Sequence, residues 1–199
     1  MPIFSLGGLA CTGKTTLVRR QALPAALTDF TQQATLWPVF RKKTGDPVIA
    51  STYNSLIASI HAKLNLRPET IIVDRFHWEG TVFEAIFSTK TSEELTAKLD
   101  EIIPVLRAVH ENDQYDGALL IDSDEAAHLN FLNDRGDHLE RQFELEYIQR
   151  QNLAFTMVGN ALGIPVVDVS RPELTSVVPK PVGDLLAGGV LDILQKYRD

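Results

Sequence analysis

The chain has 199 residues, of which 44% are hydrophobic and 23% charged, and this length and composition are typical of one folded domain spanning residues 1–199. Its 19 Lys and Arg against 26 Asp and Glu leave a formal net charge of −7, which disfavours tight non-specific binding to nucleic acid. No apolar run approaches the roughly 18 residues of a membrane span, so we expect no membrane partner.

The first half of the sequence alternates short apolar runs with stretches of helical spacing. Strands are predicted at residues 3–6, 35–40 and 70–74, and helices at about 13–27 and 51–64. Pro24 is expected to bend or end the first helix, and Pro38 weakens the second strand. Residues 41–47 have the composition of a polar loop. The run 70–74 gives the clearest strand pattern because it is β-branched, unbroken and ends in a carboxylate.

The second half continues the same alternation. Strands are predicted at residues 117–122 and 165–169, and helices from near residue 77, at about 91–109 and 123–133, in a long stretch ending at 162, and at 184–197. Thr91 and Glu94 form a capping-box pattern, and Pro104 should kink the helix that follows. The alternation predicts an α/β fold, a three-layer sandwich with helices on both faces of a mainly parallel five-stranded sheet.

A phosphate-binding motif follows the first predicted strand. Gly8-Leu9-Ala10-Cys11-Thr12-Gly13-Lys14-Thr15 matches the pattern G-x-x-x-x-G-K-[ST] in full. The glycines let the backbone curl so that N–H groups face phosphate oxygens, and the helix start adds a positive dipole end. Lys14 is predicted to reach the β- and γ-phosphates, Thr15 to hold Mg²⁺, and Thr16 to contact the α-phosphate. The predicted nucleotide-binding residues are Gly8, Ala10, Cys11, Thr12, Gly13, Lys14, Thr15 and Thr16.

Cys11 is the single cysteine of the chain and lies inside this motif. A lone cysteine excludes a disulfide framework and a Cys-rich zinc site, and it fits a reducing, cytoplasmic location. The side chain is interpreted as a small spacer, with a reactive thiol near a helix start as the alternative. The first residues lack a basic region followed by an apolar stretch, so we expect no secretory signal.

Three predicted strands end in a carboxylate: Asp74, Asp122 and Asp168. Asp74 is favoured as the partner of the phosphate loop because Arg75 follows it, which places a metal-binding oxygen beside a phosphate-binding cation. Asp122, with Glu125 three residues later, is interpreted as a helix N-cap. Asp168 precedes a polar loop and receives no specific role.

Two groups of motifs resemble a known family. The loop Gly8–Thr16, taken with Val73-Asp74-Arg75-Phe76-His77, resembles the thymidylate kinase and deoxynucleoside kinase group of phosphate-loop kinases, which carry Asp-Arg-Tyr-like or Glu-Arg-Ser-like motifs at the third strand. The second half is similar in its order of strand, helix, Arg-bearing lid, long helix and strand. The residues concerned are Ala118–Asp122, Asp134–Asp137, Glu140-Arg141, Tyr147 and Gly163–Asp168.

The resemblance implies a kinase-type fold of the phosphate-loop NTPases and several residue roles. Asp74 would lie near Mg²⁺, and Arg75 near the transferred phosphoryl group or the acceptor. A lid over about residues 133–142 would carry Arg135 and Arg141, whose charges would act like an arginine finger supplied in cis. The alternative for both arginines is a solvated charge at a helix end.

The predicted acceptor side departs from the family pattern after the second strand. The stretch 40–47 contains no Glu to act as base, whereas Arg41 would suit an acceptor phosphate, which favours a nucleotide over a nucleoside. Asp46 is the only candidate base there, and the alternative for Arg41 with Lys42 and Lys43 is a solvated basic loop. His77 is expected to reach the acceptor. The aromatic side chains that could stack on a base, or else pack in the core, are Phe40, Tyr53, Trp78 and Phe83.

We therefore expect an ATP- and Mg²⁺-dependent kinase of a small acceptor, a (deoxy)nucleoside monophosphate in the first instance. The alternatives are a deoxynucleoside kinase, a kinase of a hydroxyl on a modified base, free or within DNA, and a non-catalytic nucleotide-binding switch. The apolar helix over residues 95–109 is expected to serve either as a homodimer contact or as part of the core.

Overall fold

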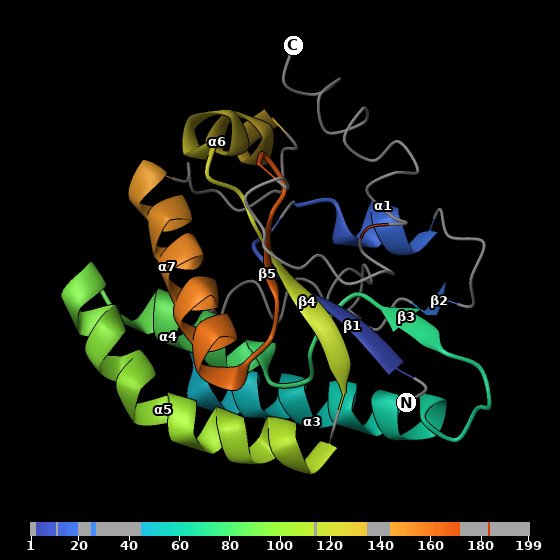
Figure 1. Cartoon of the computed structure of the whole chain (residues 1–199). Coiled ribbons are helices and arrows are strands. Elements are labelled where there is room, and N and C mark those ends of the chain that lie inside the picture. Colours follow the sequence, from blue (N-terminus) through green and yellow to red (C-terminus); the bar gives the residue numbers. More distant parts are fainter. Residues whose placement is uncertain are drawn as a thin grey trace.

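A computed structural model of the chain describes residues 3–10, 12–19, 25–26, 45–113, 115–134, 144–171 and 183. Within these residues, five strands form one sheet in the order β2-β3-β1-β4-β5, and every neighbouring pair is parallel. The strands are β1 (Ile3–Gly8), β2 (Ala25–Ala26), β3 (Ile71–Val73), β4 (Asp116–Ile121) and β5 (Val166–Asp168). Figure 1 shows β1 and β4 side by side at the centre of the sheet. The predicted parallel α/β architecture is confirmed at this level.

Helices flank the sheet (Figure 1). Those described are α1 (Lys14–Arg19), α3 (Pro47–Leu64), α4 (Glu79–Ser88), α5 (Ser92–Asp113), α6 (Glu125–Asp134) and α7 (Leu145–Leu162). None of the described helices is both long and apolar enough to cross a membrane. The predicted helix 184–197 lies outside the described residues, as does most of the predicted lid.

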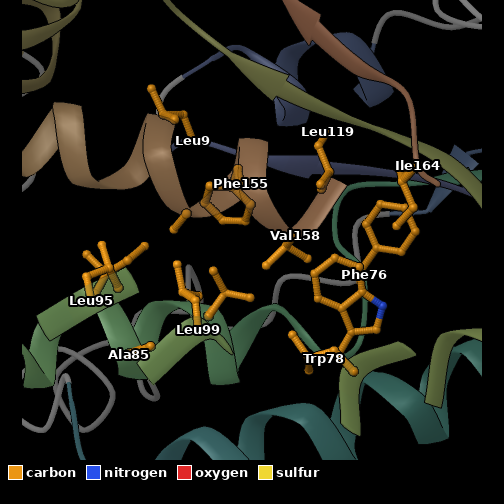
Figure 2. Close-up of a cluster of buried hydrophobic side chains, with 14 of the residues drawn as sticks. Leu9, Phe76, Trp78, Ala85, Leu95, Leu99, Leu119, Phe155, Val158 and Ile164 are labelled. Atoms are coloured by element: carbon orange, nitrogen blue, oxygen red, sulfur yellow. The ribbon is translucent and has the colours of Figure 1, made fainter. Parts of the chain in front are cut away.

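Alternating side chains of the central strands build a separate core on each face of the sheet. Leu119 of β4 joins the larger cluster with residues of α4, α5 and α7 (Figure 2), whereas its neighbours in β4 join Val18 of α1 on the other face. Phe76 lies against the backbone of β1 and β4 in the larger cluster. A Cβ atom at Gly117 would lie 2.3 Å from the Phe76 ring, so the glycine makes room for the aromatic side chain.

The helix ends follow local sequence signals. Glu94 N donates to Thr91 Oγ1 at 3.2 Å, and the Glu94 carboxylate accepts from Lys90 N at 2.7 Å, so the predicted capping box is present with its return bond one residue earlier. Helix α7 ends at Gly163, whose φ of 70° lies in the left-handed region that glycine adopts readily. Helix α5 continues through Pro104.

Two predictions for the first half are corrected. The helix predicted over 13–27 is too long, because Ala25 and Ala26 form the edge strand β2, paired with Ile72 and Val73. Two alanines are too short a segment to show a hydrophobic periodicity, so they are identified as a strand only by their pairing with β3. The strand candidate 35–40 lies outside the described residues.

Helix α3 begins earlier than predicted, and this changes the role of Asp46. Asp46 Oδ1 accepts hydrogen bonds from Val48 N at 2.9 Å and from Ile49 N at 3.4 Å, which makes Asp46 the N-cap of α3. The interpretation of Asp46 as a base is therefore replaced by a structural role. Pro47 at the first helical position is the accompanying signal.

The apolar helix considered as a dimer contact belongs mainly to the core. Leu95, Leu99 and Leu106 of α5 are buried against α4 and α7. Val105 is the exception on this helix, because 63% of it is exposed. The apolar spacing of α5 is thus accounted for by packing within the chain.

Candidate functional site

The phosphate-loop motif lies where the sheet topology favours ligand binding. The loop follows the carboxyl end of β1 and leads into α1. The chain leaves β1 toward β2 at one edge of the sheet and leaves β4 toward β5 at the other. Neighbouring strands whose connections diverge in this way form a crevice at their carboxyl ends, which is the usual ligand site of open α/β sheets.

Glycine is required at the start of the loop. Gly8 has a φ of 105°, and a Cβ atom there would lie 2.1 Å from Leu120 O. Leu9 N donates to the same carbonyl at 2.9 Å, which keeps the loop attached to β4 for one residue beyond the strand. Gly13, with a φ of 80°, provides the second unusual backbone conformation just before α1.

The side chain of Lys14 lies inside the loop and is only 5% exposed. Its Nζ donates to Gly8 O at 3.1 Å, to Thr12 Oγ1 at 3.2 Å, and to Leu9 O. The Thr12 hydroxyl in turn donates to Leu9 O at 3.1 Å. The loop thus folds around its own ammonium group, and Lys14 bonds to oxygen atoms of the motif itself.

The structure brings Thr15 and Asp74 together, as predicted. The Thr15 hydroxyl donates to Asp74 Oδ2 at 3.4 Å, and Asp74, directly after β3, is only 2% exposed. A hydroxyl and a carboxylate oxygen fit Mg²⁺, which commonly uses one or two protein oxygens and takes its other ligands from water and phosphate. Among the described residues, no group of three or more His, Cys, Asp or Glu side chains is placed to hold a metal by itself.

Arg75 is also beside the loop, held by a residue that the sequence analysis missed. Arg75 Nη1 lies 2.8 Å from Glu79 Oε2 and 3.5 Å from Gly8 O, and its guanidinium carbon lies 5.2 Å from the centre of the Phe83 ring. The second Glu79 oxygen accepts from Phe76 N at 2.8 Å. Because both oxygens accept hydrogen bonds, we interpret Glu79 as a carboxylate paired with Arg75.

Glu79 is completely buried, and its burial raises the pKa of its carboxyl group, against the opposing charges of Arg75 and Lys14. It also lies directly against the strand that carries the loop, since a Cβ atom at Gly7 would be 2.3 Å from Glu79 Oε1. Arg75 lies before α4, which begins at Glu79, so the ion pair comes from the turn over residues 75–78 rather than from helical spacing.

Two further residues missed by the sequence analysis hold Ala10 of the loop. Gln151 of α7 is buried and accepts from Ala10 N at 3.1 Å through Oε1. His128 of α6 is buried and lies 2.8 Å from Ala10 O through Nε2, while its Nδ1 lies 3.0 Å from Asp122 Oδ2. No local sequence signal marks this contact, because its partners are far apart along the chain.

The N-cap interpretation of Asp122 is therefore corrected. Helix α6 begins at Glu125, and Asp124 Oδ1 accepts from Ala127 N at 3.2 Å, so Asp124 is the cap. Asp122 instead accepts from Asp124 N at 3.1 Å and pairs with His128. The helix starts two residues later than predicted, and this moves the cap from Asp122 to Asp124 and leaves Asp122 beside the loop.

Asp168 stabilises the turn between β5 and the end of β4. Its Oδ1 accepts from Ser123 N at 3.1 Å, Ser170 N at 3.0 Å and Ser170 Oγ at 2.7 Å. Burial opposes the charge of Asp168, but these hydrogen bonds outweigh it and lower the pKa of the carboxyl group. Asp168 therefore serves to stabilise this turn.

The structure does not bring His77 and Trp78 to the loop. Both side chains are buried, and His77 Nε2 lies 2.9 Å from Asp113 Oδ2, next to the amino end of β4. Trp78 stacks on Phe76 with ring centres 4.8 Å apart (Figure 2). Both residues therefore lie in the core instead of at the expected acceptor site, because the chain after Arg75 leads back toward the amino end of β4. Tyr53 is likewise buried in α3.

The remaining predicted site residues lie outside the described part of the chain. They are Cys11, Phe40, Arg41, Lys42, Lys43, Arg135 and Arg141, and of Thr16 only the backbone within α1 is described. The described site therefore consists of the loop, Asp74, Arg75 and the side chains that hold them.

Comparison of the sequence with models of known protein families gives no match, and comparison with curated proteins gives none either.

Proposed function

We propose that this chain is a phosphotransferase that uses ATP and Mg²⁺ to phosphorylate a small nucleotide acceptor, in the first instance a (deoxy)nucleoside monophosphate. The observation that carries the proposal is the loop geometry. A full phosphate-loop motif links β1 to α1 at the divergence of β1 and β4, with Lys14 inside it and Asp74 at its edge. The kinase type of phosphate-loop fold is part of the same proposal.

The residues of the loop have distinct proposed roles. Lys14 would exchange its carbonyl partners for phosphate oxygens, and its ammonium group would neutralise charge on the group being transferred. Thr15 and Asp74 would hold Mg²⁺ directly or through water, and the bound ion would bridge phosphate oxygens and neutralise their charge. Such chemistry depends on positioning and electrostatics and needs no covalent intermediate.

Arg75 is proposed to add a second cation on the acceptor side of the triphosphate. Its side chain is 15% exposed, and its guanidinium group is held by the fully buried Glu79 carboxylate and by the loop carbonyl of Gly8. A cation fixed before the substrate arrives needs little rearrangement when charge develops. This arrangement favours an enzyme over a binding switch, because a second oriented cation serves transfer rather than retention of the nucleotide.

A coupled assay for ADP release tests the proposal. We expect release that requires Mg²⁺ and an added acceptor, with nucleoside monophosphates more active than nucleosides. Activity with nucleosides alone would assign the deoxynucleoside kinase alternative, and slow release without any acceptor would assign a nucleotide-binding switch. The absence of both ATP binding and ADP release would contradict the proposed function altogether.

A further inference from the structure

Ala10, in the middle of the phosphate loop, has both of its backbone polar groups held by side chains from other elements. Its N–H donates to Gln151 Oε1 at 3.1 Å, and its carbonyl oxygen lies 2.8 Å from His128 Nε2. We refer to Gln151, His128 and Asp122 as the Ala10 network. These three residues come from α7, from α6 and from the position after β4.

The surroundings of the His128 ring determine where its protons lie. A carbonyl oxygen only accepts hydrogen bonds, so Nε2 donates to Ala10 O. On the other side of the ring, Nδ1 faces Asp122 Oδ2 at 3.0 Å, and the second oxygen of Asp122 accepts from Asp124 N at 3.1 Å. The contact with Asp122 fixes the orientation of the ring and so holds Nε2 against Ala10 O.

Burial makes these hydrogen bonds costly to lose. His128 is 3% exposed and Gln151 is completely buried, so water cannot readily replace either partner of Ala10. The loop itself supplies no substitute in the described structure, since the carbonyls of Gly8 and Leu9 point to Lys14. The orientation of the Ala10 peptide therefore depends on the two helices behind it.

We infer that His128, oriented by Asp122, and Gln151 are positioning residues that set the Ala10 peptide of the phosphate loop for triphosphate binding. The inference rests on the proposed function, because it assigns a role in binding the nucleotide that the loop is proposed to hold. The Ala10 N–H is directed to Gln151, so phosphate would be bound by other N–H groups of the loop. Neither positioning residue is proposed to touch the reacting atoms.

Three substitutions test the network, with a control on the same helix. H128F keeps a ring of similar shape without donors, Q151M keeps the length of the side chain without an acceptor, and D122N replaces the carboxyl group that faces His128 Nδ1. The control is L132A, which removes a buried apolar contact one turn further along α6 without touching Ala10. Titration calorimetry with Mg²⁺ and the non-hydrolysable β,γ-imido analogue of ATP gives the dissociation constant for each variant.

We expect H128F and Q151M to raise the dissociation constant about tenfold, D122N to raise it less, and L132A to change it less than about twofold despite a lower melting temperature. Equal affinity in the wild type, H128F and Q151M would overturn the inference while leaving the proposed function in place. A loss in L132A as large as that in H128F would also overturn it, because general destabilisation would then explain both.

Nitrogen-15 NMR of the ligand-free protein tests the network independently of nucleotide binding. We expect the Nε2–H proton of His128 to exchange slowly with solvent in the wild type, because it is donated to Ala10 O. The Ala10 amide should exchange slowly with solvent, and Q151M should remove that protection. If the wild type binds no nucleotide, the proposed function fails. A His128 ring without a proton on Nε2, or an unprotected Ala10 amide, would overturn the network, whatever the affinity for nucleotide.

Discussion

The two ends of the sheet bury polar side chains in different ways. At the carboxyl edge, the two oxygens of Glu79 contact Arg75 and the Phe76 N–H. The two ring nitrogens of His128 contact the Asp122 carboxyl group and the Ala10 carbonyl oxygen. At the amino edge, His61 is completely buried with neither ring nitrogen in a hydrogen bond. Its neighbours are the rings of His77 and Tyr115, with centres 6.2 Å and 5.4 Å away.

The difference separates buried polar groups that hydrogen bonds hold in one orientation from those that burial alone surrounds. Glu79 and His128 at the carboxyl edge are held by partners at both of their polar atoms, although Gln151 Nε2 there has no partner. Burial at the amino edge instead favours the neutral form of the histidines. Burial, with a contribution from His77, lowers the pKa of His61 to about 3. Burial also lowers the pKa of His77 and of His110, although the nearby Asp113 carboxylate opposes both shifts.

Removing the central cation of the carboxyl edge should have the largest effect. We expect Lys14→Ala to reduce phosphoryl transfer by about 10³-fold, because the loop loses the group proposed to neutralise the transferred phosphate. Its melting temperature should stay close to that of the wild type, since the lost bonds lie within the loop. ADP release and a thermal melt measure the two effects, and a normal turnover number in this variant would contradict the assignment of Lys14.

Removing Glu79 should show that the carboxyl edge depends on paired charge. We expect Glu79→Ala to lower the free energy of unfolding by about 3–5 kcal/mol, because Arg75 loses its buried partner and Phe76 N–H loses its acceptor. Glu79→Gln is the matched control, since its amide oxygen can still accept from Phe76 N–H. Urea unfolding gives both values, and equal losses in the two variants would show that the charge of Glu79 contributes nothing.

Acid should act mainly on the amino edge. The folded-state pKa of His61 lies below its ordinary value of 6.5, so the unfolded chain takes up the proton first. The contribution of His61 is therefore complete above about pH 6.5 and falls, by up to about 1.4 kcal/mol per pH unit, as the pH decreases toward 3. His61→Phe should flatten this dependence in urea unfolding measured between pH 7 and pH 4. An unchanged slope would exclude His61 as its source.

A capping substitution supplies a small reference effect away from both regions. We expect Thr91→Ala to lower the free energy of unfolding by about 1 kcal/mol, or roughly 2–4 °C in melting temperature, because Glu94 N–H loses its capping oxygen. The pH dependence and the rate of ADP release should not change. A change in either would show that mild destabilisation is enough to alter the two regions, and would weaken conclusions from the larger variants.

Much of the fold was predictable because its signals are local. The β-branched run before Asp74 predicted β3, and Gly163 followed by Ile164-Pro165 predicted the end of α7. The edge strand Ala25–Ala26 was not predictable, because its conformation comes from pairing with β3 rather than from its own side chains. The role of Asp46 was not predictable for a related reason. A helix cap and a catalytic base can both be an aspartate, and only the neighbouring groups distinguish them.

The residues of the candidate site also fall into predictable and unpredictable groups. The loop residues and Asp74 were predictable because they follow strands directly and a single motif contains most of them. Gln151 and His128 were not, because they reach Ala10 across 141 and 118 residues of sequence. His77 and Trp78 were placed at the acceptor because they follow Arg75, but the chain reverses there and buries them. Proximity in sequence therefore predicted the motif well and its surroundings poorly.

The strands differ in length in a way that bears on self-association. Strands β1 and β4 have six residues each, whereas β5, at one end of the described sheet, has three. A short outer strand such as β5 presents few unpaired backbone groups, which guards against hydrogen bonding between the sheet edges of separate molecules. If two copies of the chain do associate, we expect contacts between side chains of helices rather than a continuous sheet through β5.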